Sequence, residues 1–184
     1  GLSERSLFDL FLSVHSFPAE SEIIIVPPVN IPGMVDVIRH HKLVIVPVDL
    51  PANDEKYLTP SANSETVSNE INAIWGIDRE AVRKAVTSKT VAILVVHPFG
   101  AVLGRSSMTG LRLIANENKL EIWEDCAQCY TGRTRSTEES GSNNTGYMGS
   151  KFANASFFSF GPIKTATALG GGLVVLRSPP LNND

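Results

Sequence analysis

The chain has 184 residues, of which 42% are hydrophobic, so it can bury one sizeable core and has the usual size of a single domain. Its formal net charge of -3 comes from interspersed charges, without the basic runs that follow a nucleic-acid backbone. The longest apolar runs have the length of strands and fall short of the roughly 20 residues that a membrane helix needs. We therefore expect a soluble protein that binds neither nucleic acid nor membrane.

The chain has only two cysteines, Cys126 and Cys129, too few for the disulfide framework of a small secreted fold. Their C-x-x-C spacing suits a thiol redox pair or half of a metal site, but a second pair is missing, so we expect no metal. The chain opens on Gly1 without a basic-then-apolar leader and ends on a polar tail. These features predict a cytoplasmic domain or fragment.

Helical and strand patterns alternate along the chain. The first helix has Ser3 as its expected N-cap, and Leu7, Leu10, Phe11 and Val14 form its predicted buried stripe. The strands are short, continuous apolar runs, as in a sheet covered on both faces. This alternation predicts a three-layer α/β/α sandwich with a mostly parallel sheet. The predicted helices cover 3–14, 32–41, 78–86 and 106–118, and the predicted strands cover 23–26, 43–46, 91–96, 120–123, 155–160 and 172–176.

Two polar stretches interrupt this rhythm, at 50–76 and 131–149. Both are rich in Asn, Ser and Thr, and both exceed the usual length of a connection inside a compact domain. We expect each of them to be a long surface loop.

Residues suited to chemistry stand near the ends of the later strands. Lys164 lies in the short connection between the last two predicted strands and is followed by the glycines 170–172. Partial enclosure there favours the neutral amine, which is the form that attacks an aldehyde. Asp125 ends a strand, at the edge of the sheet where ligands of open α/β proteins bind, and Gln128 follows three residues later.

Two further features are suited to holding a phosphate. Ser159 offers a hydroxyl five residues before Lys164, and the backbone N–H groups of Gly1, Leu2 and Ser3 stand at the start of the first helix. None of these features is specific by itself, because loop lysines, strand-ending aspartates and glycine runs are each common. Their order along the chain is the more specific observation.

That order resembles the DegT/StrS-type sugar aminotransferases, in which a strand leads into E-D-A-A-Q and, later, into S-F-x-x-x-K followed by glycines. The matching segments here are 124–128, EDCAQ, and 159–164, SFGPIK, and 95–100, VVHPFG, is similar to the family's V-H-L-Y-G turn. The resemblance covers nearly the whole chain. It implies that residues 1–184 form the large domain of a fold-type-I enzyme that depends on pyridoxal 5'-phosphate (PLP), without the family's C-terminal small domain.

The resemblance also implies a role for each candidate residue. Lys164 would form the Schiff base and move a proton, Asp125 would pair with the ring nitrogen, and Gln128 would contact the ring's hydroxyl side. Ser159 would bind the phosphate together with Gly1, Leu2 and Ser3. Ile31 stands where the family has an aromatic residue that stacks on the ring, so an aliphatic side chain would pack there instead.

The implied reaction moves an amino group from an amino-acid donor to a keto-sugar, which is nucleotide-linked in this family, in a homodimer when the protein is complete. Two alternatives stay open: a non-catalytic domain of the same fold, favoured by Ile31 and the two polar stretches, and a thiol redox protein, suggested by the C-x-x-C spacing. Lys164 argues for transamination, because nothing structural requires its amine and the family's dehydratases replace it.

Overall fold

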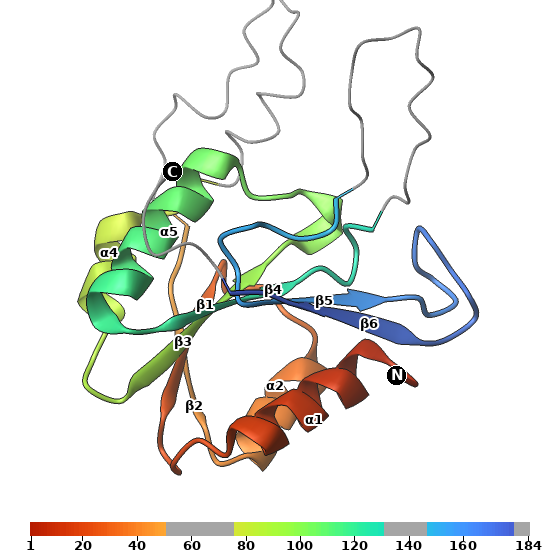
Figure 1. Cartoon of the computed structure of the whole chain (residues 1–184), viewed down its shortest axis with the longest axis horizontal. Helices are drawn as coiled ribbons and strands as arrows, with labels where there is room; N and C mark the ends of the chain where they lie inside the picture. Colours follow the sequence, from red (N-terminus) through yellow and green to blue (C-terminus); the bar gives the residue numbers. More distant parts are fainter. Residues whose placement is uncertain (51–75, 131–146, 179–184) are drawn as a thin grey trace, which may run out of the picture.

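The computed structural model describes residues 1–50, 76–130 and 147–178, and within them one sheet has six strands in the order β2-β1-β3-β4-β5-β6. All neighbouring strands are parallel except β5 and β6. Helices α1 and α2 cover one face of the sheet, and α4 and α5 cover the other (Figure 1). The elements are α1 (Glu4–His15), β1 (Glu22–Val26), α2 (Pro32–His40), β2 (Val44–Pro47), α4 (Arg79–Ala85), β3 (Thr90–Val96), the 3-10 turn η2 (Pro98–Gly100), α5 (Arg105–Asn118), β4 (Glu121–Asp125), β5 (Ala155–Ser159) and β6 (Gly172–Leu176).

The predicted fold class is confirmed, because the chain forms three layers around a mostly parallel sheet. Alternate side chains of a central strand enter opposite cores, as the pleat requires. In β1, Ile24 and Val26 pack with α4 and α5, whereas Ile23 and Ile25 pack with α1 and α2. No helix in the three described segments is long and apolar enough to cross a membrane. Most of the two predicted polar loops lies outside the described residues.

Helix α1 begins where the sequence predicts, but it buries a different face. Ser3 and Ser6 form a capping box, in which each side chain bonds the other residue's backbone N–H. The predicted stripe is half correct, because Leu7 and Phe11 pack partly buried against the core, whereas Leu10 and Val14 are 59% and 75% exposed. The buried residues are Glu4, Phe8 and Leu12, which recur every four residues and lie on one face.

Phe8 ties α1 to the centre of the sheet. Its ring is fully buried and meets Trp123 of β4 and Phe157 of β5 edge-to-face, at 6.1 and 5.2 Å between ring centroids. This contact fixes the start of α1 beside the ends of β4 and β5.

We expect Phe8→Ala to lower the free energy of unfolding by roughly 3–5 kcal/mol, because it opens a cavity where three rings meet. Leu10→Ala is the matched control, since Leu10 lies on the same helix but is 59% exposed. Urea unfolding followed by circular dichroism measures both variants. Equal losses for the two variants would contradict this role of Phe8.

Candidate active site

A cavity of about 210 Å³ opens beyond the carboxyl ends of β3 and β4. Four of the residues predicted from the sequence line it: Asp125, Gln128, Lys164 and Ile31. This is the edge of an open α/β sheet at which ligands generally bind. Residues more than 130 positions apart are thus brought around one space.

Asp125 is a fixed carboxylate at the end of β4. It is 6% exposed, and its Oδ1 accepts the backbone N–H of Ala127 at 3.1 Å. Its carbonyl oxygen accepts the N–H of His97 at 3.2 Å, which extends the pairing of β3 and β4 by one residue. The strand and the turn therefore hold the Asp125 side chain in one direction.

Lys164 sits in a tight turn between β5 and β6. Its N–H donates to the carbonyl of Gly161 at 3.0 Å, and the wider loop is closed by the N–H of Ala168 donating to Phe160 at 3.0 Å. Lys164 is half-buried and lines the cavity, as the sequence predicts. These two backbone hydrogen bonds fix the position of the Lys164 backbone, and with it the point from which the side chain reaches the cavity.

Gln128 and Ile31 are more exposed than Asp125 and Lys164, the other two predicted residues in the cavity wall. The side-chain oxygen of Gln128 accepts the N–H of Phe99, a contact that joins the segment after β4 to the turn after β3. Ile31 is the N-cap of α2 and is 50% exposed. Its aliphatic side chain gives the cavity an apolar wall without the flat face of an aromatic ring.

The first residues of the chain run along the start of β6. The N–H of Gly172 donates to Gly1 at 3.0 Å, and that of Gly171 donates to Leu2 at 2.9 Å. A Cβ added to Gly172 would lie 2.6 Å from the backbone nitrogen of Glu4, so this close approach requires glycine. Ser159 pairs with Gly172 across the sheet and therefore lies near the head of α1.

The donors at this helix start are distributed differently from the prediction. The N-terminal amine of Gly1 donates to Gly172, and the N–H of Ser3 donates to the Ser6 hydroxyl. In the described part of the chain, the next two N–H groups, of Glu4 and Arg5, make no hydrogen bond. The N–H of Leu2 is likewise without a hydrogen bond among the described residues, so Leu2 of the predicted set remains available to an anion together with Glu4 and Arg5.

Directly behind Asp125, a second carboxylate is locked into a buried network. Glu124 is fully buried, and its Oε1 accepts from His97 Nε2 at 3.0 Å and from the Tyr147 hydroxyl. Its Oε2 accepts from the Ser150 N–H at 2.9 Å and the Ser156 hydroxyl at 2.5 Å. Burial raises the pKa of Glu124, but these donors outweigh it and leave the pKa below its ordinary value.

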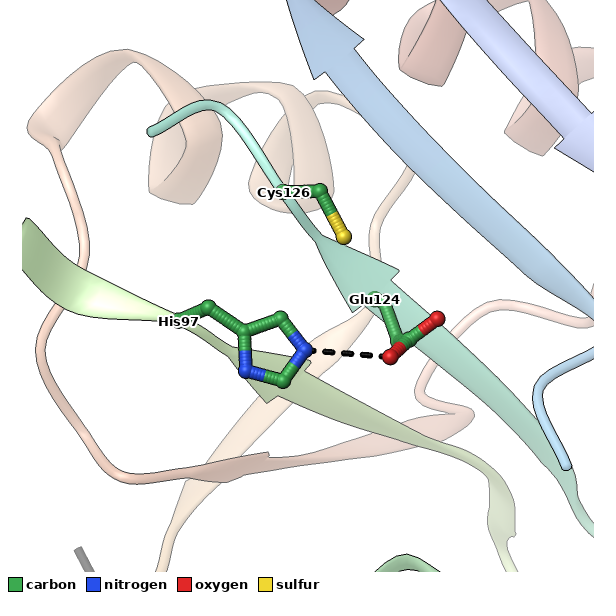
Figure 2. Close-up of side chains that lie close together, drawn as sticks. All are labelled: His97, Glu124 and Cys126. Atoms are coloured by element: carbon green, nitrogen blue, oxygen red, sulfur yellow. Dashed lines mark hydrogen bonds and ion pairs between the residues drawn. The ribbon is translucent and has the colours of Figure 1, made fainter. Parts of the chain in front are cut away.

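His97 belongs to this structural network. Its Nδ1 accepts the N–H of Leu103 at 3.2 Å, so a neutral ring carries its proton on Nε2 and donates it to Glu124. Figure 2 shows His97 at the end of β3 facing Glu124 and Cys126. Their potential ligand atoms lie within 4.8 Å of one another, which is close enough for a metal ion.

The bonding pattern speaks against a metal at these three residues. Both oxygens of Glu124 already accept hydrogen bonds, and His97 has a partner on each nitrogen. Burial, followed by a hydrogen bond with Cys129, raises the pKa of the Cys126 thiol, whereas a metal ligand needs the thiolate. The same burial of both cysteines disfavours thiol exchange.

Two residues at the site were missed by the sequence analysis. Asn30 lines the cavity, and its buried Nδ2 has no hydrogen-bond partner among the described residues. Glu4 lies at the head of α1, is 5% exposed, and its Oε1 is likewise without a partner in the described segments. The spacing of Glu4 with Phe8 and Leu12 was the available signal for its burial.

The sequence model of the DegT/DnrJ/EryC1/StrS aminotransferase family matches residues 61–184, more than half of the chain. The chain belongs to this family. Aminotransferases of the family depend on PLP. The resemblance that the sequence motifs indicate is therefore confirmed, along with the fold type.

Named members of the aminotransferase family show how much of a protein the chain covers. It is 36% identical over 100 residues to the dTDP-3-amino-3,4,6-trideoxy-alpha-D-glucose transaminase of Micromonospora megalomicea subsp. nigra, covering 54% of this chain and 23% of that protein. It is 35% identical over 101 residues to the L-glutamine:2-deoxy-scyllo-inosose aminotransferase of Streptomyces paromomycinus, covering 55% and 21%. The crystal structure of Bacillus subtilis NtdA with bound cofactor PMP superposes with a TM-score of 0.63 at 20% identity, covering 98% of this chain and 33% of that one.

We expect Glu124→Gln to destabilise the fold by roughly 3 kcal/mol at pH 7, because it leaves partners of a buried charge unpaired. The lowered pKa of Glu124 means that its contribution is present above the unfolded pKa near 4.5 and is lost as the pH falls through the folded pKa. The variant should therefore lose less stability than the wild type on acidification. Urea unfolding at several pH values measures this.

Glu117→Gln is the matched control, because Glu117 is also a hydrogen-bonded carboxylate, with Arg83 as its donor, but its side chain is 51% exposed. We expect that variant to keep the stability and acid response of the wild type. A similar loss at both sites would contradict the role of the buried network.

Proposed function

We propose that this chain is the PLP-binding large domain of an aminotransferase that moves an amino group from an amino acid to a nucleotide-linked keto-sugar. The observation that carries the proposal is the placement of Asp125 and Lys164 around one cavity, at the ligand-binding edge of the sheet. The chain spans less than half the length of the relatives described above. The activity of the whole protein is therefore proposed here.

The residues of the cavity fit the cofactor. Among the described residues, Asn30 Nδ2 in the cavity and the N–H groups of Glu4 and Arg5 at the nearby helix start have no hydrogen-bond partner, and an anionic, polar ligand would satisfy them. Asp125 would hold a proton on the ring nitrogen, and the amine of Lys164 would attach the cofactor aldehyde. Bound PLP supplies an electron sink for breaking a bond at the amino-bearing carbon.

The other predicted residues would orient the cofactor. Ser159 lies beside the lysine loop, where a Cβ added to Gly161 would be 3.8 Å from its hydroxyl oxygen, and it would contact the phosphate together with the start of α1. Gln128 would approach the ring's hydroxyl side, and Ile31 would pack on one face of the ring. During transfer, the released amine of Lys164 would carry a proton between substrate and cofactor.

The choice of acceptor rests on the named relatives. One of the two acts on an amino-sugar nucleotide by name and the other on an aminocyclitol precursor, so cyclic polyhydroxy ketones are the class supported. We propose an amino-acid donor for the same reason, because the second name includes L-glutamine.

A homodimer of the complete protein is part of the proposal. Large apolar side chains are exposed on the segments that frame the cavity: Phe99 is 80% exposed, and Ile163 and Leu169 of the lysine loop are 93% and 82% exposed. Clustered exposure of this kind marks interaction surfaces. A second copy packed over the cavity would bury these side chains and complete the site.

The alternatives gain less support. A non-catalytic domain of this fold would have no need for the amine of Lys164 at the cavity, although Ile31 in place of an aromatic residue favours it. A redox protein would need an accessible thiolate, whereas Cys126 and Cys129 are 0% and 2% exposed.

We expect PLP to attach to Lys164. The complete chain is mixed with PLP, its visible absorption is recorded, and the adduct is fixed with borohydride and located by peptide mass spectrometry. Lys164→Ala should lose both the band and the adduct, whereas Lys89→Ala, at an exposed position, should keep them. Label spread over surface lysines, or retained in Lys164→Ala, would overturn the proposed function.

A further inference from the structure

Glu4 is an unexpected residue at the head of α1. An acidic residue in a first helical turn is common, because it faces the positive end of the helix dipole, but it normally remains in water. Glu4 is instead 5% exposed, while nearby Leu2 is 91% exposed. It shares the buried face of α1 with Phe8 and Leu12, whose packing turns that face, and with it the Glu4 side chain, toward β4 and β5.

The carboxyl group of Glu4 faces the residues proposed to hold the cofactor. Helix α1 packs on β5, where its Phe8 meets Phe157, and Phe157 pairs with Asp125, so the head of α1 lies beside the end of β4. The charges of Asp125 and Lys164 act on the Glu4 carboxyl group. Its Oε1 is buried without a hydrogen-bond partner in the described segments. The hydrogen bonds from Gly171 to Leu2 and from Gly172 to Gly1 hold the start of α1 against β6, and the backbone of Glu4 packs closely on Gly172.

Two carboxyl groups form a hydrogen bond only when one of them carries a proton. Burial raises the pKa of Glu4 to about 10, with a further increase from the charge of Asp125 and a smaller one from Cys129, while Lys164 opposes them. Glu4 is therefore the protonated partner at neutral pH. A neutral Glu4 can donate to Asp125 without adding a second negative charge.

We propose that Glu4 is a positioning residue of the cofactor site, which in its protonated form donates a hydrogen bond to Asp125 and so couples cofactor binding to a proton. This inference rests on the proposed function, because it concerns the same site.

The backbone N–H of Glu4 would also help to bind the phosphate group of the cofactor. The free N–H groups of Glu4 and Arg5 stand at the positive end of α1, where a phosphate dianion would bind. A charged Glu4 side chain would repel that dianion and Asp125 together, whereas a neutral one leaves both interactions intact. Loss of the Glu4 proton should therefore weaken cofactor binding.

The test compares the dissociation constant for PLP in the wild type and in Glu4→Gln between pH 7 and 10.5. Glutamine keeps the size and an N–H donor but has no proton to lose. We expect the two constants to agree within about twofold at pH 7, and the wild type to bind about fourfold more weakly than the variant at pH 10.5, half a pH unit above the pKa. The ratio of the two dissociation constants is free of the effects of other titrating groups, because the wild type and the variant share those groups.

Glu80→Gln is the control, because Glu80 also lies in a first helical turn but its side chain is 75% exposed. It should follow the wild type at every pH. Binding by Glu4→Gln that is tenfold tighter at pH 7 would show an ionised Glu4 and overturn the inference. A ratio that stays at one up to pH 10.5 would overturn it as well.

A second measurement without PLP separates this inference from the proposed function. The raised pKa means that the stability contributed by Glu4 is fully present below the unfolded pKa near 4.5 and is lost progressively as the pH rises toward 10. Glu4→Gln should therefore gain stability relative to the wild type between pH 5 and 9, even if PLP does not bind. A pH-independent difference would overturn the pairing of Glu4 with Asp125, whatever the outcome with Lys164.

Discussion

The site depends on how β4 ends, with two adjacent carboxylates that the pleat of the strand sends to opposite faces of the sheet. Ile122 packs in the core beneath α4 and α5, and Trp123 packs in the core beneath α1 and α2. The alternation continues through Glu124 and Asp125. Glu124 meets the His97 network, and Asp125 meets the head of α1. One pair of residues therefore supplies a buried structural anchor on one face and a cavity-lining carboxylate on the other.

The two faces treat negative charge in opposite ways. Glu124 is surrounded by four hydrogen-bond donors and keeps its charge, at the cost of a rigid arrangement of His97, Tyr147 and Ser156. Asp125 has one backbone donor and another carboxyl group as its neighbour, so its surroundings are incomplete without a further cation or proton. Incomplete satisfaction of this kind is expected where a ligand binds, because the ligand must supply the missing partner.

The sequence predicted the fold well because strand and helix signals agree along the chain. The strands around Ile23 and Val91 are continuous apolar runs that only a covered parallel sheet can bury, and the structure pairs them directly. Asp125 and Lys164 line one cavity for a similar reason, since the ends of parallel strands meet at one edge. Their individual roles remain predictions, because they depend on a ligand.

The features that the sequence analysis missed depend on how helix α1 is rotated about its axis and on contacts with residues far away in the chain. Leu10 and Val14 are apolar, so they suggested the buried face of α1, but the ring contacts of Phe8 rotate the helix so that Glu4 faces inward instead. Hydrophobic periodicity considers only apolar residues, so it cannot predict that an acidic residue is buried. Asn30 was missed because nothing local distinguishes a cavity-lining amide from a loop amide.

The mouth of the cavity is apolar, because exposed apolar residues surround it, whereas polar groups line the interior. Asp125 contributes a buried carboxyl group and Lys164 a half-buried amine, whereas Phe99, Ile163 and Leu169 present large apolar surface to water. Single exposed hydrophobic residues are common in soluble proteins, but these three lie on the two loops that enclose one cavity. A polar substrate gains little from such a rim directly. The proposed dimer rests on this rim, because protein packed over it would exclude water from the polar groups of the cavity and strengthen their electrostatic interactions.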